Sequence, residues 1–329
     1  MGLQEYVIKR IIVTIILLWA IATVNFLIFN MLPGTTINKY IAKLSPGGTG
    51  SERIKQLMHI FGLDRPLHER YLIYLRNMFT FNFGSSHQFG DVRNAIMRAL
   101  PNTLLLMGIS EIASIIFGIL IGVIVAYKRG TIIDSAVVTG SLFTYSVPVF
   151  WLGWIIVNIF ALQLHWFPSG GYVPTEWAIN PPDNVLTLIL GRLWCLILPA
   201  FTLFIFIVGG WILLTRASVL ETITEDYVLT ARAKGLKTRS VLYKHVLKNA
   251  SLPLITNVAL AMGFLITGAI ITETVFSYGG MGSLIFTAIS FSDIPMMQAI
   301  FFIVAVLVVV ANFIADLLYG VIDPRIRYG

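Results

Sequence analysis

The sequence predicts an all-α integral membrane protein with six transmembrane helices, and its composition and long apolar segments together support that prediction. Of the 329 residues, 57% are hydrophobic and only 12% are charged, and the mean hydropathy is +0.84. Soluble domains have about 25% charged residues, so this chain belongs in a bilayer. Six segments reach the roughly 20 apolar residues that a helix needs to cross a membrane. They are 11–31, 104–127, 133–164, 186–214, 254–271 and 297–319.

Basic residues gather in the short connections on one side of these spans. More than half of the 23 Lys and Arg residues lie before the first span, after the second, after the fourth or after the sixth. The positive-inside rule puts these connections in the cytoplasm, so we expect both termini to be cytoplasmic. The same rule accounts for the net charge of +7, and we therefore expect no nucleic-acid partner.

We expect one transmembrane domain, 1–329, with two sizeable segments outside the spans. Segment 32–100 is expected to be extracytoplasmic, and its pieces "SERIKQLMHIFGL" and "LHERYLIYLRNMF" have apolar residues at helical spacing. About 65 residues interrupted by Gly and Pro bury little core unaided, which favours a small helical cap over a separate domain. Segment 216–252 is expected to be a cytoplasmic loop.

The cytoplasmic loop 216–252 predicts a pair of short helices. Thr224 is followed by two acids and is a suitable N-cap, and Gly235 fits a left-handed helix stop. A second helix is expected to begin at Thr238, with Pro253 opening the next span. A helix of about ten residues is marginal in water, so the first one needs a surface to lie against. The pattern alone leaves two candidates open, the membrane interface and a groove on a soluble partner.

This loop resembles the cytoplasmic EAA loop of ABC importer permeases. "TARAKGL" followed by "HVLKNASLP" is similar to the form found in the dipeptide, oligopeptide and nickel branch. Other landmarks of that branch follow in order along nearly the whole chain: "LIFNMLPG", "RALPNTLLL", "YKRGTIIDS", "SVPVFWLG", "ITETVFSYGGMG" and "NFIADLLYGVIDPRIR". The general EAA pattern has Glu six residues before the glycine and Pro thirteen after it. Leu229 and Lys248 stand at those places here, which argues against the maltose branch.

The resemblance implies an ABC importer permease fold in the prokaryotic plasma (inner) membrane, as the first, B-type permease of a heterodimeric pair. It also implies the partners: a homologous second permease, two ATP-binding subunits, an extracytoplasmic substrate-binding protein and the lipid bilayer. Transport would follow ATP-driven alternating access. Peptides are the first expectation for the cargo, and oligosaccharides or nickel complexes are the alternatives. A channel or a secondary transporter is the remaining alternative, but the chain has no clear internal repeat.

In that family the EAA loop is the coupling helix that docks into the ATP-binding subunit. Ala231, Ala233 and Gly235 would permit close docking, and Arg232 and Lys234 would supply contacts around that seat. The full set of expected coupling residues is Asp226, Tyr227, Thr230, Ala231, Arg232, Ala233, Lys234, Gly235 and Leu236.

We expect no enzyme activity and no cofactor in this chain. It has no phosphate-cradling GxxxxGK[ST] loop and no HExxH motif, so no catalytic or metal-binding residues are assigned. The single cysteine, Cys195, has no second cysteine to pair with. ATP and Mg are expected on the partner subunits, which must supply the energy.

Four residues are candidates for the translocation pathway or its outer gate. Glu111 is an acid near the middle of a span, where charge is costly. It either meets a cationic part of the cargo, or it is a carboxyl that is kept neutral by burial or bonded to a hydroxyl on a neighbouring helix. Glu273 and Tyr278 come before a Gly-rich bend that resembles the outer gate, although a plain interfacial acid is the alternative for Glu273. Asn158 either lines the pathway or makes an interhelical hydrogen bond.

Overall fold

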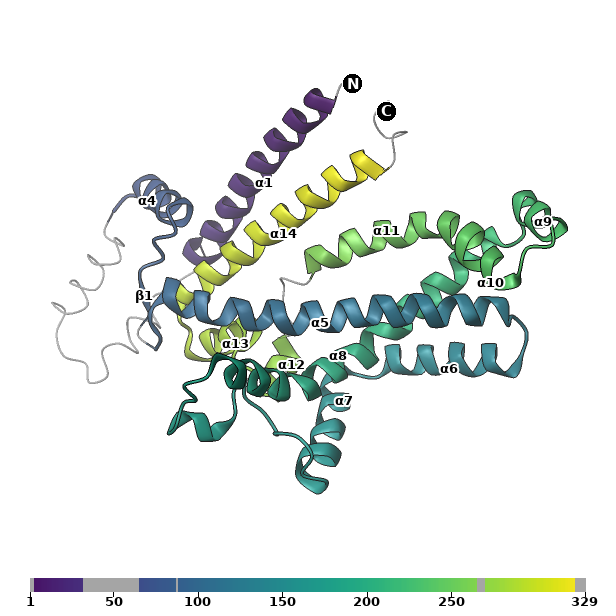
Figure 1. Cartoon of the computed structure of the whole chain (residues 1–329). Helices are drawn as coiled ribbons and strands as arrows, with labels where there is room; N and C mark the ends of the chain where they lie inside the picture. The colour runs from purple at the N-terminus through teal and green to yellow at the C-terminus, as the bar shows by residue number, and fades with distance from the viewer. Residues whose placement is uncertain (1–2, 32–64, 87, 265–269, 323–329) are drawn as a thin grey trace. The chain divides into compact units, whose positions relative to one another are not determined.

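The computed structural model describes residues 3–31, 65–86, 88–264 and 270–322, which are mostly helical (Figure 1). The chain divides into two compact units, unit 1 (1–101 with 280–329) and unit 2 (102–279). Within the described ranges, four helices are long and apolar enough to cross a membrane, and a bent pair would make a fifth span. The predicted mostly helical membrane architecture is therefore confirmed, whereas the count of six spans stays a prediction.

Unit 1 is built on two long helices that pack against each other, with a short hairpin and two shorter helices beside them. Figure 1 shows the N-terminal end of α1 beside the C-terminal end of α14. In the antiparallel hairpin, Ser85 lies opposite Asp91. The elements are α1 (Leu3–Met31), α4 (Leu67–Phe79), β1 (Ser85–Ser86), β2 (Gly90–Asp91), the start of α5 (Val92–Tyr127), α13 (Met281–Phe291) and α14 (Ile294–Ile322).

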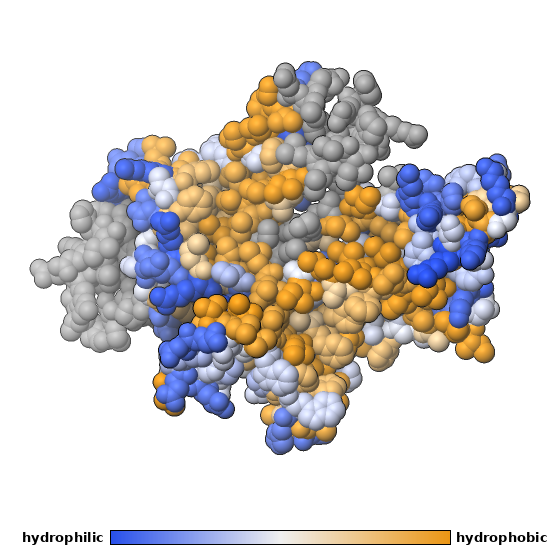
Figure 2. Space-filling view, viewed as in Figure 1, coloured by the Kyte–Doolittle hydropathy of each residue, from blue (hydrophilic) through white to orange (hydrophobic). Residues whose placement is uncertain are grey.

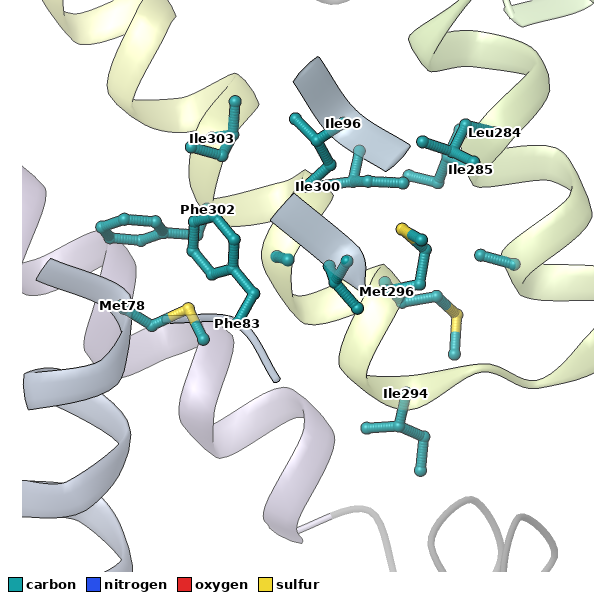
Figure 3. Packing of buried hydrophobic residues seen from close by; sticks show 14 of the residues in the cluster. Met78, Phe83, Ile96, Leu284, Ile285, Ile294, Met296, Ile300, Phe302 and Ile303 are labelled. Atoms are coloured by element: carbon teal, nitrogen blue, oxygen red, sulfur yellow. The ribbon is translucent and has the colours of Figure 1, made fainter. Parts of the chain in front are cut away.

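The core of unit 1 joins α4 and the hairpin to the last helix. Figure 3 shows Met78 and Phe83 next to Phe302, and Ile96 next to Ile300. The helix predicted from "LHERYLIYLRNMF" is α4, with the same bounds, because its apolar face is encoded locally. The helix predicted from "SERIKQLMHIFGL" lies outside the described residues.

Unit 2 contains the rest of α5 and a series of helices of very different lengths. Its longest helix, α8, packs against α6, α7 and α11. The elements are α6 (Ile132–Ser146), α7 (Val149–Ile156), the π-helix η1 (Val157–Gln163), the 3-10 helix η2 (Thr175–Ala178), α8 (Val185–Thr222), α9 (Asp226–Ala233), α10 (Thr238–Ser240), the π-helix η3 (Val241–Val246), α11 (Leu247–Phe264) and α12 (Ile270–Val275).

The third predicted span, 133–164, is bent. α6 and the helix that starts at Val149 meet at 99°. The bend has a local cause, because a proline disfavours helical geometry in the residue before it. Val147, directly before Pro148, is extended at φ −76° and ψ 132°.

The prediction that Pro253 opens a new span is wrong. α10, η3 and α11 form one continuous helical run from Thr238, and Pro253 lies inside α11. The residues at the two joins, Val241 and Leu247, both have right-handed helical backbone angles. A proline inside a helix removes one backbone hydrogen bond, which membrane helices tolerate when neighbouring groups satisfy the freed carbonyl.

Candidate coupling helix and buried polar contacts

The short helix α9 begins one residue later than the sequence predicts. Glu225, not Thr224, occupies the cap position with extended backbone angles. The Thr224 hydroxyl instead donates to the Glu221 carbonyl of the preceding helix at 3.1 Å. The predicted stop is confirmed, since Gly235 has φ +72°, a conformation that favours glycine.

The inner face of α9 is anchored on its own chain. Val228 is 0% exposed and Ala231 is also buried. Their hydrophobic cluster contains Val123 near the end of α5, Val219 of α8 and Val246 of η3. This cluster is the surface that a helix of eight residues needs in order to persist.

The outer face of α9 points away from that cluster. Asp226, Leu229, Thr230 and Ala233 are exposed and follow the i, i+3, i+4, i+7 spacing of one helical face. Leu229 is 56% exposed. Figure 2 shows hydrophilic residues gathered at the α9 and α10 end of unit 2, giving way to hydrophobic ones along the neighbouring helices. Leu229 is thus an exposed apolar side chain on the polar end of this unit.

The structure separates the nine expected coupling residues into two groups. Ala231 is buried, so its small side chain serves the packing of α9 on its own chain. The rest of the set is exposed: Asp226, Tyr227, Thr230, Arg232, Ala233, Lys234, Gly235 and Leu236.

An ion pair joins the first turn of α6 to α8, near the end of α8 that leads into α9. The Arg216 guanidinium donates from Nε to Asp134 Oδ1 at 2.7 Å and from Nη2 to Oδ2 at 2.9 Å. The Gly130 amide of the α5–α6 turn donates to Oδ2 at 2.9 Å. Asp134 is therefore held by a two-pronged guanidinium and by a backbone amide. Exposed Lys128 and Arg129 stand in the same turn.

Two of the pathway candidates are buried, Glu273 in α12 and Tyr278 in the turn that follows this helix. Glu273 is 0% exposed, and its Oε1 accepts a hydrogen bond from the Thr103 hydroxyl at 2.6 Å. The Tyr278 amide donates to the Glu273 carbonyl at 2.8 Å, and the Asn102 side chain donates to the Gly279 carbonyl at 3.0 Å. α5 therefore fastens both the acid and the Gly-rich bend that Tyr278 precedes.

The loop after η1 covers this turn. The Gly171 amide donates to the Phe276 carbonyl at 2.8 Å. The Tyr172 ring lies against Gly279 and carries the Arg192 guanidinium above it, 5.9 Å from the ring centroid. In this arrangement the Tyr278 side chain is enclosed within unit 2, at only 1% exposure, whereas Ser277 in the same turn is exposed.

Glu111 lies about 12 Å further along α5 than Thr103, at eight residues of 1.5 Å rise. It is buried, and its Oε1 accepts a hydrogen bond from the Trp211 indole of α8 at 2.9 Å. The carboxyl is bonded to a neighbouring helix, but the expected hydroxyl partner is wrong, because the donor is an indole. Asn158 is exposed, and it accepts a hydrogen bond from Gln163 in its own helix at 2.7 Å.

No group of three or more His, Cys, Asp or Glu side chains able to hold a metal occurs in the part of the chain that the structure describes.

Comparison with known families accounts for this arrangement. A family model described as binding-protein-dependent transport system inner membrane component matches residues 118–328, and the companion model for the N-terminal part of such membrane components matches residues 3–107. The chain belongs to this family. Its helices and its family together make it a multi-pass membrane protein and the permease component of a binding-protein-dependent transporter.

Family members of similar length match over almost the whole chain. The di/tripeptide transport system permease protein DppB of Pseudomonas aeruginosa (strain UCBPP-PA14) is 34% identical, with 98% of this chain and 99% of the relative covered. The oligopeptide transport system permease protein AppB of Bacillus subtilis (strain 168) is 36% identical, with 99% and 100% covered. The dipeptide transport system permease protein DppB of Escherichia coli (strain K12) is 33% identical, with 98% and 99% covered.

Sequence reasoning alone does not identify several of the residues at these sites of the permease. Thr103 is the partner of Glu273 and Trp211 is the partner of Glu111. Asp134 pairs with Arg216. Asp134 stands inside the family landmark "YKRGTIIDS", so the motif marked the place but not the partner. A hydroxyl or an indole inside an apolar run carries no signal of its own about which helix it faces.

Proposed function

We propose that this permease conducts peptides, as one of the two membrane subunits of an ABC importer, and that α9 is its coupling helix. The observation that carries the coupling role is the two-sided character of α9. Its inner face is fixed by Val228, which is 0% exposed, and its outer face presents Leu229 at 56% exposure. A helix held firmly on one side and open on the other can receive a force and pass it on. Peptide cargo is supported by the names of the relatives, which are peptide permeases.

The proposed orientation puts α9 in the cytoplasm. Its hydrophobic cluster includes Val123 and Ala126, near the end of α5 and directly before the basic turn with Lys128 and Arg129. Two basic connections therefore meet at one end of unit 2, as the positive-inside rule requires of cytoplasmic loops. Both termini would lie on the same cytoplasmic side, in agreement with the pairing of α1 and α14 in unit 1.

In the proposed cycle, ATP and Mg bind to two partner ATP-binding subunits, and one of these subunits contacts the outer face of α9. Their closure displaces α9, and the cluster around Val228 passes that displacement to α5, α8 and η3. A homologous second permease completes the pathway, and a substrate-binding protein delivers cargo from outside. Glu273 and the turn after α12 that contains Tyr278 would be the outer closure that opens during the cycle.

The coupling role is tested with a charged residue on the outer face of α9. We expect Leu229→Asp, in the complete importer reconstituted into vesicles, to abolish stimulation of ATP hydrolysis by loaded binding protein. The chain should still insert, because this side chain is exposed. The matched control is Ile132→Asp, since Ile132 is 89% exposed in the first turn of α6, where an acid is favourable. If Leu229→Asp transports as well as the control, α9 is not the docking helix.

Cargo is tested in the same vesicles. Binding protein loaded with a mixture of di- to pentapeptides is compared with binding protein exposed to oligosaccharides or to nickel complexes. We expect only the peptides to stimulate ATP hydrolysis. Stimulation by one of the other two classes with no response to peptides would replace the cargo assignment and leave the coupling assignment in place.

A further inference from the structure

The pair of Asp134 and Arg216 ties the start of α6 to the last third of α8, the helix that leads into α9. Both carboxylate oxygens are engaged, at 2.7 and 2.9 Å, so that the guanidinium fixes direction as well as distance. Asp134 is buried and Arg216 is half-buried. Arg216 stands one turn before Val219, which belongs to the cluster that holds α9. The pair is thus attached to the same body as α9.

Contacts between α6 and α8 continue from this pair along both helices. At Gly209, a side chain would lie within 2.7 Å of the Ser141 carbonyl, so the two backbones approach closely there. Further on, the Tyr145 and Phe206 rings are stacked with 6.1 Å between their centroids. α6 therefore packs against α8 along most of the length of α6, and the ion pair fixes the N-terminal end of α6 to α8.

Beyond the bend at Pro148, α7 reaches α12, with its buried acid, and the turn that follows. A side chain at Gly153 would lie 3.3 Å from the Phe276 ring and 3.4 Å from Val275. Phe276 directly follows α12, and it belongs to the same hydrophobic cluster as Tyr278. One bent pair of helices, α6 and α7, thus has its first end at the ion pair and its second part at the turn after α12.

We propose that the Asp134–Arg216 ion pair is the positioning link through which movement of α9 reaches α6, then α7, and so Glu273 and the turn that contains Tyr278. The proposal rests on the proposed function, because it takes α9 as the point where force enters. A two-pronged carboxylate–guanidinium pair suits this task, since it resists rotation and sliding, which a single hydrophobic contact permits. Arg216 and Asp134 touch neither cargo nor nucleotide in this role.

The test measures coupling and the outer turn together in the complete importer, in a Ser277→Cys background. Ser277 is exposed in the turn, whereas the native Cys195 is buried. With Asp134 and Arg216 intact, we expect the rate of maleimide labelling at position 277 to differ severalfold between the nucleotide-free and the vanadate-trapped importer. Asp134→Asn and Arg216→Gln should each remove that difference and lower transport per ATP hydrolysed severalfold, with the KM for cargo unchanged.

Two further variants separate positioning from simple stability. Arg216→Lys keeps the positive charge but cannot form the two-pronged contact with the carboxylate. Compared with Arg216→Gln, it should therefore restore assembly fully and coupling only in part. Lys128→Gln removes a charge from the neighbouring exposed turn and should change neither readout. A merely structural role would lower ATP hydrolysis and transport in proportion. If Arg216→Lys and Asp134→Asn assemble and keep both the normal coupling ratio and the nucleotide-dependent labelling, the proposal is overturned.

Cross-linking from a photoreactive residue at position 233 of α9 is measured in the same samples. Ala233 is exposed on the outer face, and it should cross-link to an ATP-binding subunit in every variant. Absence of this product in the importer with the intact ion pair would refute the coupling role of α9 itself. Its presence, together with normal coupling in Asp134→Asn, would refute only the role of the ion pair.

Discussion

Replacing Val228 by alanine should loosen α9 without changing the face that it offers to a partner. Val228 is 0% exposed, so the substitution removes two buried methyl groups, which contribute about 1.6 kcal/mol at 0.8 kcal/mol each. The higher helix propensity of alanine offsets up to about 0.6 kcal/mol of this loss. The net weakening of about 1 kcal/mol corresponds to a roughly fivefold larger equilibrium constant for local opening.

Amide hydrogen exchange across α9 in the complete importer measures this equilibrium, since local opening limits the exchange of these amides. We expect roughly fivefold faster exchange in Val228→Ala, by the arithmetic above, together with a lower ratio of transport to ATP hydrolysis. The control is Val185→Ala, the same chemical change at a valine that is 67% exposed in the first turn of α8. Unchanged exchange of α9 in Val228→Ala would mean that the cluster does not hold this helix.

Two more predictions concern the contact between α5 and α8. Gly118→Ala should prevent stable folding, because the added carbon would lie 2.3 Å from Trp211 Cβ. The control is Gly108→Ala in the same helix, where the added carbon meets open space and should be tolerated. The yield and the Tm of each variant in detergent distinguish the two outcomes. Trp211→Phe should lower the free energy of unfolding by about 1 kcal/mol through loss of the hydrogen bond to Glu111, as for other bonds between membrane helices. Trp194→Phe, on an exposed side chain, should have little effect, and equal effects of the two would argue against that bond.

The features that the sequence predicts well are encoded within a few neighbouring residues. The spacing of apolar residues in "LHERYLIYLRNMF" defines both ends of α4, and Gly235 marks the stop of α9. The start of α9 is one residue off, because the Thr224 hydroxyl can bond backwards to α8 as well as forwards to α9. Local signals of this kind locate an element and leave its partner open.

Single-sequence reasoning cannot supply the direction in which a helix runs after a bend, nor the partner to which a buried side chain bonds. Hydrophobicity gives the length of 133–164 but is blind to the 99° bend within it, although Pro148 is the cause. Pro253 gives the opposite error: the sequence predicts a new helix there, but the helix continues through the proline. The donor to Glu273 stands 170 residues away in sequence, and the donor to Glu111 stands 100 residues away. Only the packing of α5 with its neighbours brings these groups together.

The contacts of α5 indicate how unit 2 responds to a push at α9. The Ser110 hydroxyl, which donates to the Leu106 carbonyl of its own helix at 2.7 Å, also lies 3.3 Å from the Ala200 carbonyl of α8. Gly118 lies against the Trp211 backbone, so α5 and α8 have little freedom to slide past each other. Interlocked helices of this kind shift between discrete arrangements instead of deforming continuously. If α9 is the coupling helix, a displacement that enters at Val228 would move α5 and α8 together. The turn after α12 would then open only if the α6–α7 pair moved with them. Under our proposal, the ion pair between Asp134 and Arg216 determines whether it does.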